Sequence, residues 1–285
     1  MANSLTRFLD TENKEFISLG GFNDLIKMRD GWMVYNKNDI YIGKSIKEYG
    51  EWSQGEIDIC KQILRPSDVV IEVGSNIGSH TLALAKTVDK GAVFAFEPQN
   101  VIFQNLCSNI SMNSITNCVC YQNAVSDKSK EQCFIPNLDY TRQNNFGGIS
   151  ISNEKNDFSL PVGVVTLDDK FHDLNTLKIL KMDIEGNELN ALKGAYNLIK
   201  RNKPFIYLEN DRLDKSKELI EFLFSLDYRI FWHISKLYNK DNFFKNSNNV
   251  FGNIASWNMI AFDKKLDIKI DLPEVKDSSF HPLRK

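Results

Sequence analysis

The sequence predicts an α/β fold with an open, mostly parallel β-sheet and helices on both faces. Short runs of β-branched and aliphatic residues, such as residues 69–73, alternate with stretches of helical periodicity, such as residues 99–112. Runs this short and this apolar are typical of strands that are buried on both faces. Several of the runs end in an acidic residue. Because parallel strands end at the same sheet edge, these acids are expected to line a ligand crevice there.

Composition narrows the function classes. The 285 residues carry 35 basic and 37 acidic side chains, so no strong attraction to nucleic acid or to an anionic membrane is predicted. Five cysteines, with none in a Cys-x-x-Cys pair, favour a reducing compartment. Residues 1–7 lack the apolar core of a signal peptide, and no apolar run reaches the ~20 residues of a membrane span. We therefore expect a soluble, cytoplasmic protein.

We expect three parts: a lead-in over residues 1–65, a main α/β domain over residues 66–263 with an insertion at 127–165, and a polar, loosely held tail over residues 264–285. In the lead-in, Asp30-Gly31 predicts a hairpin turn, and an amphipathic helix ends at Arg65-Pro66. Between them, Tyr49, Glu51 and Trp52 either close over a cofactor or form a tight turn with a surface acid.

A glycine turn follows the first buried strand, with the pattern Glu72-x-Gly74-x-Asn76-x-Gly78. The glycines let the backbone bend and let a ligand approach it, and the free N–H groups at the start of the next helix face that ligand. This pattern predicts a nucleotide-binding loop that includes Ser75. A purely structural turn between a strand and a helix is the alternative.

Charge indicates which nucleotide the turn binds. The third glycine of a dinucleotide fingerprint is missing, and the Glu72 carboxylate would repel a pyrophosphate. The same carboxylate suits S-adenosylmethionine, which carries an amino group and a positively charged sulfur. About twenty residues further on, Glu97-Pro98 ends the second strand, where a carboxylate can accept both ribose hydroxyls. Asn123-Ala124 follows the third strand and is expected to meet the adenine edge, unless Asn123 is only a turn former.

Two later strands also end in acids. Residues 177–182 lead into Asp183, and residues 204–208 lead into Glu209-Asn210. The insertion at 127–165, rich in Asn, Gly and Ser, is expected to be either a lid over this edge or an ordinary surface loop.

The ordered motifs together resemble the FkbM-like family of S-adenosylmethionine-dependent methyltransferases. The likeness covers roughly residues 29–263. It rests on Tyr49-Gly-Glu-Trp, Glu72-Val-Gly-Ser-Asn-Ile-Gly-Ser-His-Thr, Phe96-Glu-Pro, Asn123-Ala-Val-Ser, Val165-Thr-Leu-Asp-Asp, Lys181-Met-Asp-Ile-Glu-Gly-Asn-Glu, Trp232-His and Asn258-Met. The resemblance implies a Rossmann-like class I fold, a seven-stranded sheet with the last strand inserted antiparallel, and O-methylation of sugars or polyketides. Glu72 departs from the Asp of many members.

A sugar hydroxyl is a poor nucleophile until its proton leaves, which requires a base or a metal ion. His233 is the first candidate base, and a packed strand-end histidine is its alternative. Asp183, Glu209 and Asn210 offer a second route, because they are similar to the Mg²⁺ ligands of catechol-type O-methyltransferases. His80 either meets the cofactor carboxylate or lies along the helix surface. His172 and His281 are expected to be surface residues.

The sequence thus favours an S-adenosylmethionine-dependent O-methyltransferase acting on a hydroxyl of a glycan or small metabolite. Three alternatives stay open: a cofactor-binding scaffold without turnover, a nucleic-acid methyltransferase, and an NAD-dependent oxidoreductase. No Lys/Arg-rich stripe and no Asn-Pro-Pro-Tyr/Phe motif supports nucleic acid as a partner. The acceptor and the oligomeric state do not follow from the sequence.

Overall fold

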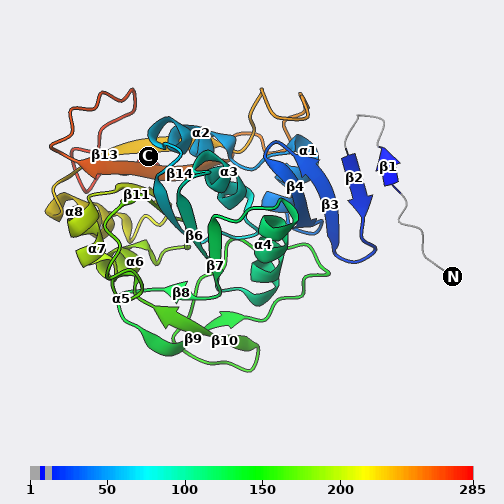
Figure 1. Cartoon of the computed structure of the whole chain (residues 1–285), viewed down its shortest axis with the longest axis horizontal. Helices are drawn as coiled ribbons and strands as arrows, with labels where there is room; N and C mark the ends of the chain where they lie inside the picture. Colours follow the sequence, from blue (N-terminus) through cyan, green and yellow to red (C-terminus); the bar gives the residue numbers. More distant parts are fainter. Residues whose placement is uncertain (1–6, 10–14, 285) are drawn as a thin grey trace.

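The computed structural model describes residues 7–9 and 15–284 and centres on a seven-stranded sheet (Figure 1). The strand order is β13-β14-β12-β11-β5-β6-β7, and β14 runs antiparallel to both of its neighbours, whereas the other pairs are parallel. This confirms the predicted fold class and the inserted last strand. The strands are β5 (Val69–Val73), β6 (Ala92–Phe96), β7 (Cys118–Tyr121), β11 (Leu177–Met182), β12 (Phe205–Glu209), β13 (Tyr228–Lys236) and β14 (Ala255–Asp263).

Helices cover both faces of this sheet, because each central strand presents apolar side chains to both sides. On one face, β5 and β11 pack with α2 and α3; on the other, Ile71 and Leu180 share a core with α6, α7 and α8. The helix α4 continues the first layer beside β7. The helices are α2 (Gln54–Ile63), α3 (Ser79–Thr87), α4 (Asn100–Met112), α6 (Glu188–Lys193), α7 (Tyr196–Asn202) and α8 (Ser216–Ser225).

The N-terminal part forms a separate four-stranded antiparallel sheet and one short helix. The expected hairpin turn at Asp30-Gly31 is confirmed, since Met28 and Gly31 are paired residues of β3 and β4. Its buried side chains pack against α3 and α4, so this sheet is attached to the helical layer next to the ligand edge. The elements are β1 (Arg7–Leu9), β2 (Glu15–Ser18), β3 (Asn23–Met28), β4 (Gly31–Asn36) and α1 (Ile42–Tyr49).

The insertion at 127–165 contains β9 (Lys130–Pro136) and β10 (Ser159–Val165), which form a three-stranded sheet with β8 (Ala124–Val125) just before it. Between β9 and β10, the segment around Phe146 returns to the main body, where that ring is fully buried. Thr166 caps α5 (Leu167–Lys170), because its side-chain oxygen accepts the Asp169 N–H at 3.1 Å.

The tail is not loosely held, which corrects the expectation from its polar composition. The Trp232 N–H donates to the Pro273 carbonyl at 2.9 Å, and the Val275 N–H donates to Ile230 at 2.8 Å. These bonds pair the tail with β13, the edge strand of the main sheet. His281 is buried rather than a surface residue, and its Nε2 lies 2.7 Å from the Asn210 carbonyl oxygen. The tail therefore covers an edge that would otherwise expose unpaired backbone groups.

Among the described residues, no helix is both long and apolar enough to span a bilayer. The expectation about a signal peptide concerns residues 1–7, nearly all of which lie outside the described part.

Candidate active site

A cavity of about 380 Å³ opens at the edge where the predicted acidic strand ends meet. Its floor is formed by the ends of β5, β6, β11 and β12, with Glu72, Glu97, Asp183 and Glu209 all in its lining. The insertion contributes Asn145, Gly147 and Gly148, and the segment before β14 contributes Ile254. The sequence prediction that these four acids gather at one edge is therefore confirmed by the geometry.

The glycine turn has the backbone conformation that its sequence predicts. Gly74 and Gly78 have φ values of +83° and +85°, a region that favours glycine, and Asn76 between them has φ +48°. A Cβ at Gly74 would lie 1.8 Å from the Asp183 carbonyl oxygen, so no larger residue fits. The Ser75 hydroxyl donates to the Glu72 carbonyl at 3.2 Å and fixes the turn, and Ser75 lines the cavity.

Glu97 is held at the end of β6 by two backbone donors. The Asn76 N–H donates to Oε2 at 3.0 Å, and the Gln99 N–H donates to Oε1 at 2.8 Å. Each carboxylate oxygen keeps a lone pair that can accept a hydroxyl. Burial raises the pKa of Glu97 to about 7, against the lowering effect of the two N–H donors. Glu97 is thus pre-oriented for a pair of hydroxyl donors such as those of a ribose.

A second, smaller hollow adjoins the first and shares Gly74, Glu97 and Asp183 with it. Its lining contains Pro98, Asn123 and Ala124, so the structure brings the predicted cofactor residues of β6 and β7 to one hollow. The Asn123 side chain donates to the Gly163 carbonyl at 3.3 Å, which ties this wall to β10.

Beneath the cavity lies a buried charge cluster that sequence reasoning did not assign. Lys181 on β11 is 1% exposed, and its Nζ lies 3.8 Å from both Glu56 Oε2 and Glu72 Oε1. The Thr81 hydroxyl donates to the other Glu72 oxygen at 2.5 Å. Burial raises the pKa of Glu72, whereas Lys181 and Thr81 act in the opposite direction. For Lys181, burial lowers the pKa, but the neighbouring carboxylates outweigh it and the net shift is upward.

His80 lies within this cluster and not along the helix surface. Its Nε2 is 3.0 Å from the Trp52 carbonyl oxygen, and its Nδ1 is 4.0 Å from Glu56 Oε2. Burial, aided by the positive charge of Lys181, lowers the pKa of His80 to about 4. The imidazole is therefore neutral at pH 7 and already uses Nε2 within the protein.

Asp183 and Glu209 form a coupled carboxyl pair in the cavity. Burial, followed by the charge of Asp183, raises the pKa of Glu209 well above its ordinary value. Burial also raises the pKa of Asp183, which Lys181 and a hydrogen bond with Glu209 partly offset. The Glu209 Oε2 atom is buried and, within the described residues, has no hydrogen-bond partner. Two adjacent carboxyl groups with raised pKa values can share a proton and accept another.

A third acid, Glu185, lies beside this pair. One carboxylate oxygen from each of Asp183, Glu185 and Glu209, the kind of atom that can bind a metal ion, lies within 4.8 Å of the other two. The Arg212 guanidinium bonds Glu185 at 2.5 Å and Asp211 at 3.3 Å, so it supplies the positive charge at this rim.

Two predicted site residues lie elsewhere. The Asn210 side chain donates to Ser216 Oγ at 2.9 Å, next to Met259 below the sheet edge, and is absent from the cavity lining. Asn210 therefore does not complete a metal-ligand set with Asp183 and Glu209. His233 is also absent from the lining, because it lies within β13 and its Nδ1 bonds the Tyr207 hydroxyl at 2.8 Å. This arrangement fits the packed-histidine alternative and not the general base.

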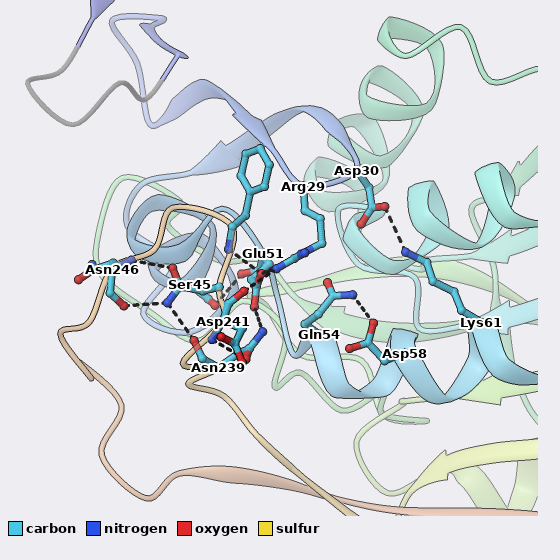
Figure 2. A network of polar contacts seen from close by, with 12 residues as sticks. Arg29, Asp30, Ser45, Glu51, Gln54, Asp58, Lys61, Asn239, Asp241 and Asn246 are labelled. Atoms are coloured by element: carbon cyan, nitrogen blue, oxygen red, sulfur yellow. Dashed lines mark hydrogen bonds and ion pairs between the residues drawn. The ribbon is translucent and has the colours of Figure 1, made fainter.

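Glu51 is buried but does not reach the cavity, so neither sequence hypothesis for it holds. Figure 2 shows its carboxylate between Arg29 and the asparagine-rich segment that connects β13 to β14, residues 237–254. Oε2 accepts two bonds from Arg29, at 2.5 and 2.9 Å, and one from the Phe243 N–H at 2.9 Å, while Oε1 accepts the Asn239 side chain at 2.8 Å. The ends of this segment, Leu237 and Ile254, line the cavity. Glu51 thus fixes the segment that forms one wall of the cavity. Its neighbour Trp52, and not Glu51 itself, lines the cavity.

Trp52, which the sequence suggested could close over the cofactor, does line the cavity. Several other lining residues carried no signal that sequence reasoning used: Tyr41, Lys181, Glu185, Asp211, Arg212 and Trp257. Lys181 and Glu185 do belong to the motif Lys181-Met-Asp-Ile-Glu-Gly-Asn-Glu, so their closeness to Asp183 in the sequence could have indicated that they line the site.

Comparison with known proteins decides the family. Residues 72–230, more than half of the 285, match the model of the methyltransferase FkbM domain. The chain belongs to this family of S-adenosylmethionine-dependent methyltransferases. The match contains the glycine turn, Glu97, Lys181 and the Asp183–Glu209 pair.

Two curated relatives are similar over part of their length. The hexuronic acid methyltransferase AglP of Haloferax volcanii is 29% identical over 151 residues, which are 51% of this chain and 59% of the relative. A tRNA(Phe) (4-demethylwyosine(37)-C(7)) aminocarboxypropyltransferase of Methanocaldococcus jannaschii is 34% identical over 71 residues, 24% of this chain and 28% of that protein. The chain thus spans well under two thirds of either.

Two solved structures are similar more loosely. Methyltransferase FkbM from Methylobacillus flagellatus has 18% identity and a TM-score of 0.48, covering 70% of this chain and 44% of that one. The M. jannaschii TYW2 structure in complex with AdoMet has 14% identity and a TM-score of 0.43, covering 86% and 88%. These alignments are too loose to place individual residues.

Proposed function

We propose that this methyltransferase transfers the methyl group of S-adenosylmethionine to a hydroxyl of a sugar, free or within a glycan. The observation that carries the proposal is the Asp183–Glu209 pair, a proton acceptor placed beside the glycine turn. S-adenosylmethionine supplies a methyl group that its positively charged sulfur has already activated. The task left to the protein is to hold the acceptor oxygen, remove its proton and exclude water.

The donor set of the cavity fits this cofactor. Glu97 presents two oxygens to a diol, Asn123 and Ala124 stand at the adjoining hollow, and Glu72 offers negative charge beside the glycine turn. A cavity lined by acids at the tips of four strands suits a ligand with positive charge more than a pyrophosphate.

The proton transfer can be assigned to the pair. As the acceptor oxygen takes the methyl group, its O–H bond breaks and the proton passes to the Asp183–Glu209 pair. The pair then releases this proton to solvent when the product leaves. A carboxylate whose pKa is raised by burial is a stronger base than an ordinary carboxylate, and general-base catalysis contributes roughly 10²–10⁴-fold. The unpartnered Glu209 Oε2 offers an acceptor for the hydroxyl proton.

A sugar acceptor is supported by the aromatic side chains around the opening. Trp52, Trp257 and Tyr41 all line the cavity, and aromatic faces pack well against the C–H groups of sugar rings. The partial similarity to AglP, whose name specifies a hexuronic acid, points to the same class of acceptor. We place the reaction in the cytoplasm, where the five cysteines remain free thiols.

The proposal does not use the divalent cation that the sequence suggested. Asn210 turns away from the cavity, and Arg212 already neutralises Glu185. We therefore assign proton removal to Asp183 and Glu209 alone and expect turnover to survive treatment with EDTA.

The test combines turnover with binding. Purified protein is incubated with S-adenosylmethionine and extracted host glycans and metabolites, and mass spectrometry detects acceptors that gain one CH₂. We expect Asp183→Asn and Glu209→Gln to lower turnover at least about 100-fold, while Glu209→Gln binds the cofactor with unchanged affinity in calorimetry. Glu218→Gln, on the exposed face of α8, is the matched control. A parent protein that binds the cofactor but modifies no acceptor would support the scaffold alternative.

A further inference from the structure

The side chain of Lys181 is a buried cation whose hydrogen-bonding capacity is unused. It is 1% exposed and lines the cavity. Its two carboxylate neighbours, Glu56 and Glu72, lie at 3.8 Å, which is within ion-pair range but beyond a hydrogen bond. Among the residues that the structure describes, the Nζ donates no hydrogen bond to any of them. An ammonium has three N–H donors, and because Lys181 lines the cavity, these donors can be offered to a ligand there.

The position of Lys181 explains why it stays charged. Lys181 on β11 and Glu72 on β5 are paired residues of adjacent parallel strands, so their side chains leave the same face of the sheet. Glu56 approaches from α2 on that face. The two carboxylates hold the ammonium in its charged form, while the donors that they leave free face the cavity beside Gly74.

No other cation competes for this part of the lining. His80 is neutral at pH 7, and its Nε2 is used by the Trp52 carbonyl. Arg212 is engaged by Glu185 and Asp211 at the acidic rim. Lys181 is therefore the available anion-binding group on the described cavity wall, and Glu72 is the carboxylate next to it.

We propose that Lys181 binds the α-carboxylate of the methionine part of S-adenosylmethionine, while Glu72 receives the α-amino group beside it. The ligand carries both groups on its α-carbon. Its carboxylate meets the Lys181 ammonium, and its ammonium meets the Glu72 carboxylate on the neighbouring strand. Lys181 thereby takes the role that the sequence suggested for His80. This inference rests on the proposed use of S-adenosylmethionine but not on the identity of the acceptor.

Two ligands that differ in the amino-acid part separate binding from a structural role. S-adenosylhomocysteine carries the α-carboxylate and α-amino groups, whereas 5′-methylthioadenosine keeps the adenosine and sulfur but lacks both. Calorimetry measures the dissociation constants of both ligands for the parent and for Lys181→Met. We expect Lys181→Met to weaken S-adenosylhomocysteine about 10–100-fold, the range of a hydrogen bond to a charged group. Its affinity for 5′-methylthioadenosine should change less than about threefold.

A second variant guards against misfolding. Lys181→Met leaves two buried carboxylates without their cation, so the double variant Glu56→Gln with Lys181→Met removes one of them and should show the same selective loss. Equal weakening of both ligands, or no weakening of either, in a double variant that unfolds cooperatively would overturn the inference. A selective loss in a protein that methylates no sugar would uphold this inference and contradict the proposed function instead.

Discussion

The guanidinium of Arg29 binds the buried carboxylate of Glu51 through Nε at 2.9 Å and Nη2 at 2.5 Å (Figure 2). The two residues come from different parts of the lead-in: Arg29 lies in the β3–β4 turn, and Glu51 follows α1. Through Asn239 and Phe243, Glu51 connects that turn to the segment whose ends line the cavity. The contact therefore joins the N-terminal sheet to the wall of the active site.

Breaking this contact should destabilise the protein. Glu51→Ala leaves Arg29 and two further donors without their acceptor, and we expect the free energy of unfolding in urea to fall by about 3 kcal/mol. The matched control is Lys264→Ala. Lys264 bonds Asp227 at the same 2.5 Å, but both side chains are more than half exposed, so the unfolding free energy should hardly change. Equal effects of the two substitutions would show that Glu51 is not a structural clamp.

Glu209→Gln should make the protein more stable and less active. The parent buries a carboxyl oxygen that lacks a partner, and a neutral amide can donate to Asp183 in its place. At pH 8 we expect a gain of roughly 1–2 kcal/mol in unfolding free energy, together with the loss of turnover. Thermal unfolding and initial rates on one preparation test this, with Glu218→Gln unchanged in both. A less stable variant would argue against an unpartnered Glu209.

Glu97 should make stability depend on pH in a defined direction. Burial raises its pKa from 4.5 to about 7, so between these values the folded protein binds a proton that the unfolded chain releases. The unfolding free energy of the protein without cofactor therefore falls as the pH rises from about 4.5 to 7, by up to about 3 kcal/mol. In Glu97→Gln this contribution is absent. If parent and variant showed identical pH profiles, Glu97 would not carry a raised pKa.

Removing the tail should expose the edge of the main sheet. A chain ending at Leu272 lacks the backbone bonds to Ile230 and Trp232 and the buried His281. We expect a fall of roughly 2–4 kcal/mol in unfolding free energy and concentration-dependent association, because an uncovered edge strand pairs with other chains. Light scattering and urea unfolding measure both effects. A chain ending at Leu283 retains these contacts and is the control; similar behaviour of the two chains would contradict the role of the tail.

The sequence predicted the cofactor edge well because parallel-sheet topology brings strand ends together. Glu72, Glu97, Asp183 and Glu209 are far apart in the chain, yet each follows a recognisable strand, so their meeting could be inferred. The same logic failed for Asn210, because its side chain donates to Ser216 Oγ and so points away from the cavity, although its neighbours Glu209 and Asp211 line it.

Contacts between distant segments could not be inferred in this way. Lys181 resembles an ordinary polar residue in a strand until the structure shows Glu56 and Glu72 on either side of it. The burial of Glu51 depends on hydrogen bonds from a loop nearly 200 residues later in the chain. The burial of His281 depends on its contact with the Asn210 carbonyl oxygen, which the residues around His281 in the sequence do not indicate. The polar composition of residues 264–285 predicted a loose tail. Composition says nothing about backbone hydrogen bonds, and it is these bonds that hold the tail on β13.

The most direct test of the account is transfer of an isotopically labelled methyl group from S-adenosylmethionine to p-nitrophenyl glycosides, with product analysis by mass spectrometry and NMR. Transfer to a ring hydroxyl by the parent protein, lost in Asp183→Asn and kept in Glu218→Gln, is the predicted result. Calorimetric binding of NAD with none of S-adenosylmethionine, or transfer that persists in Asp183→Asn, would contradict it.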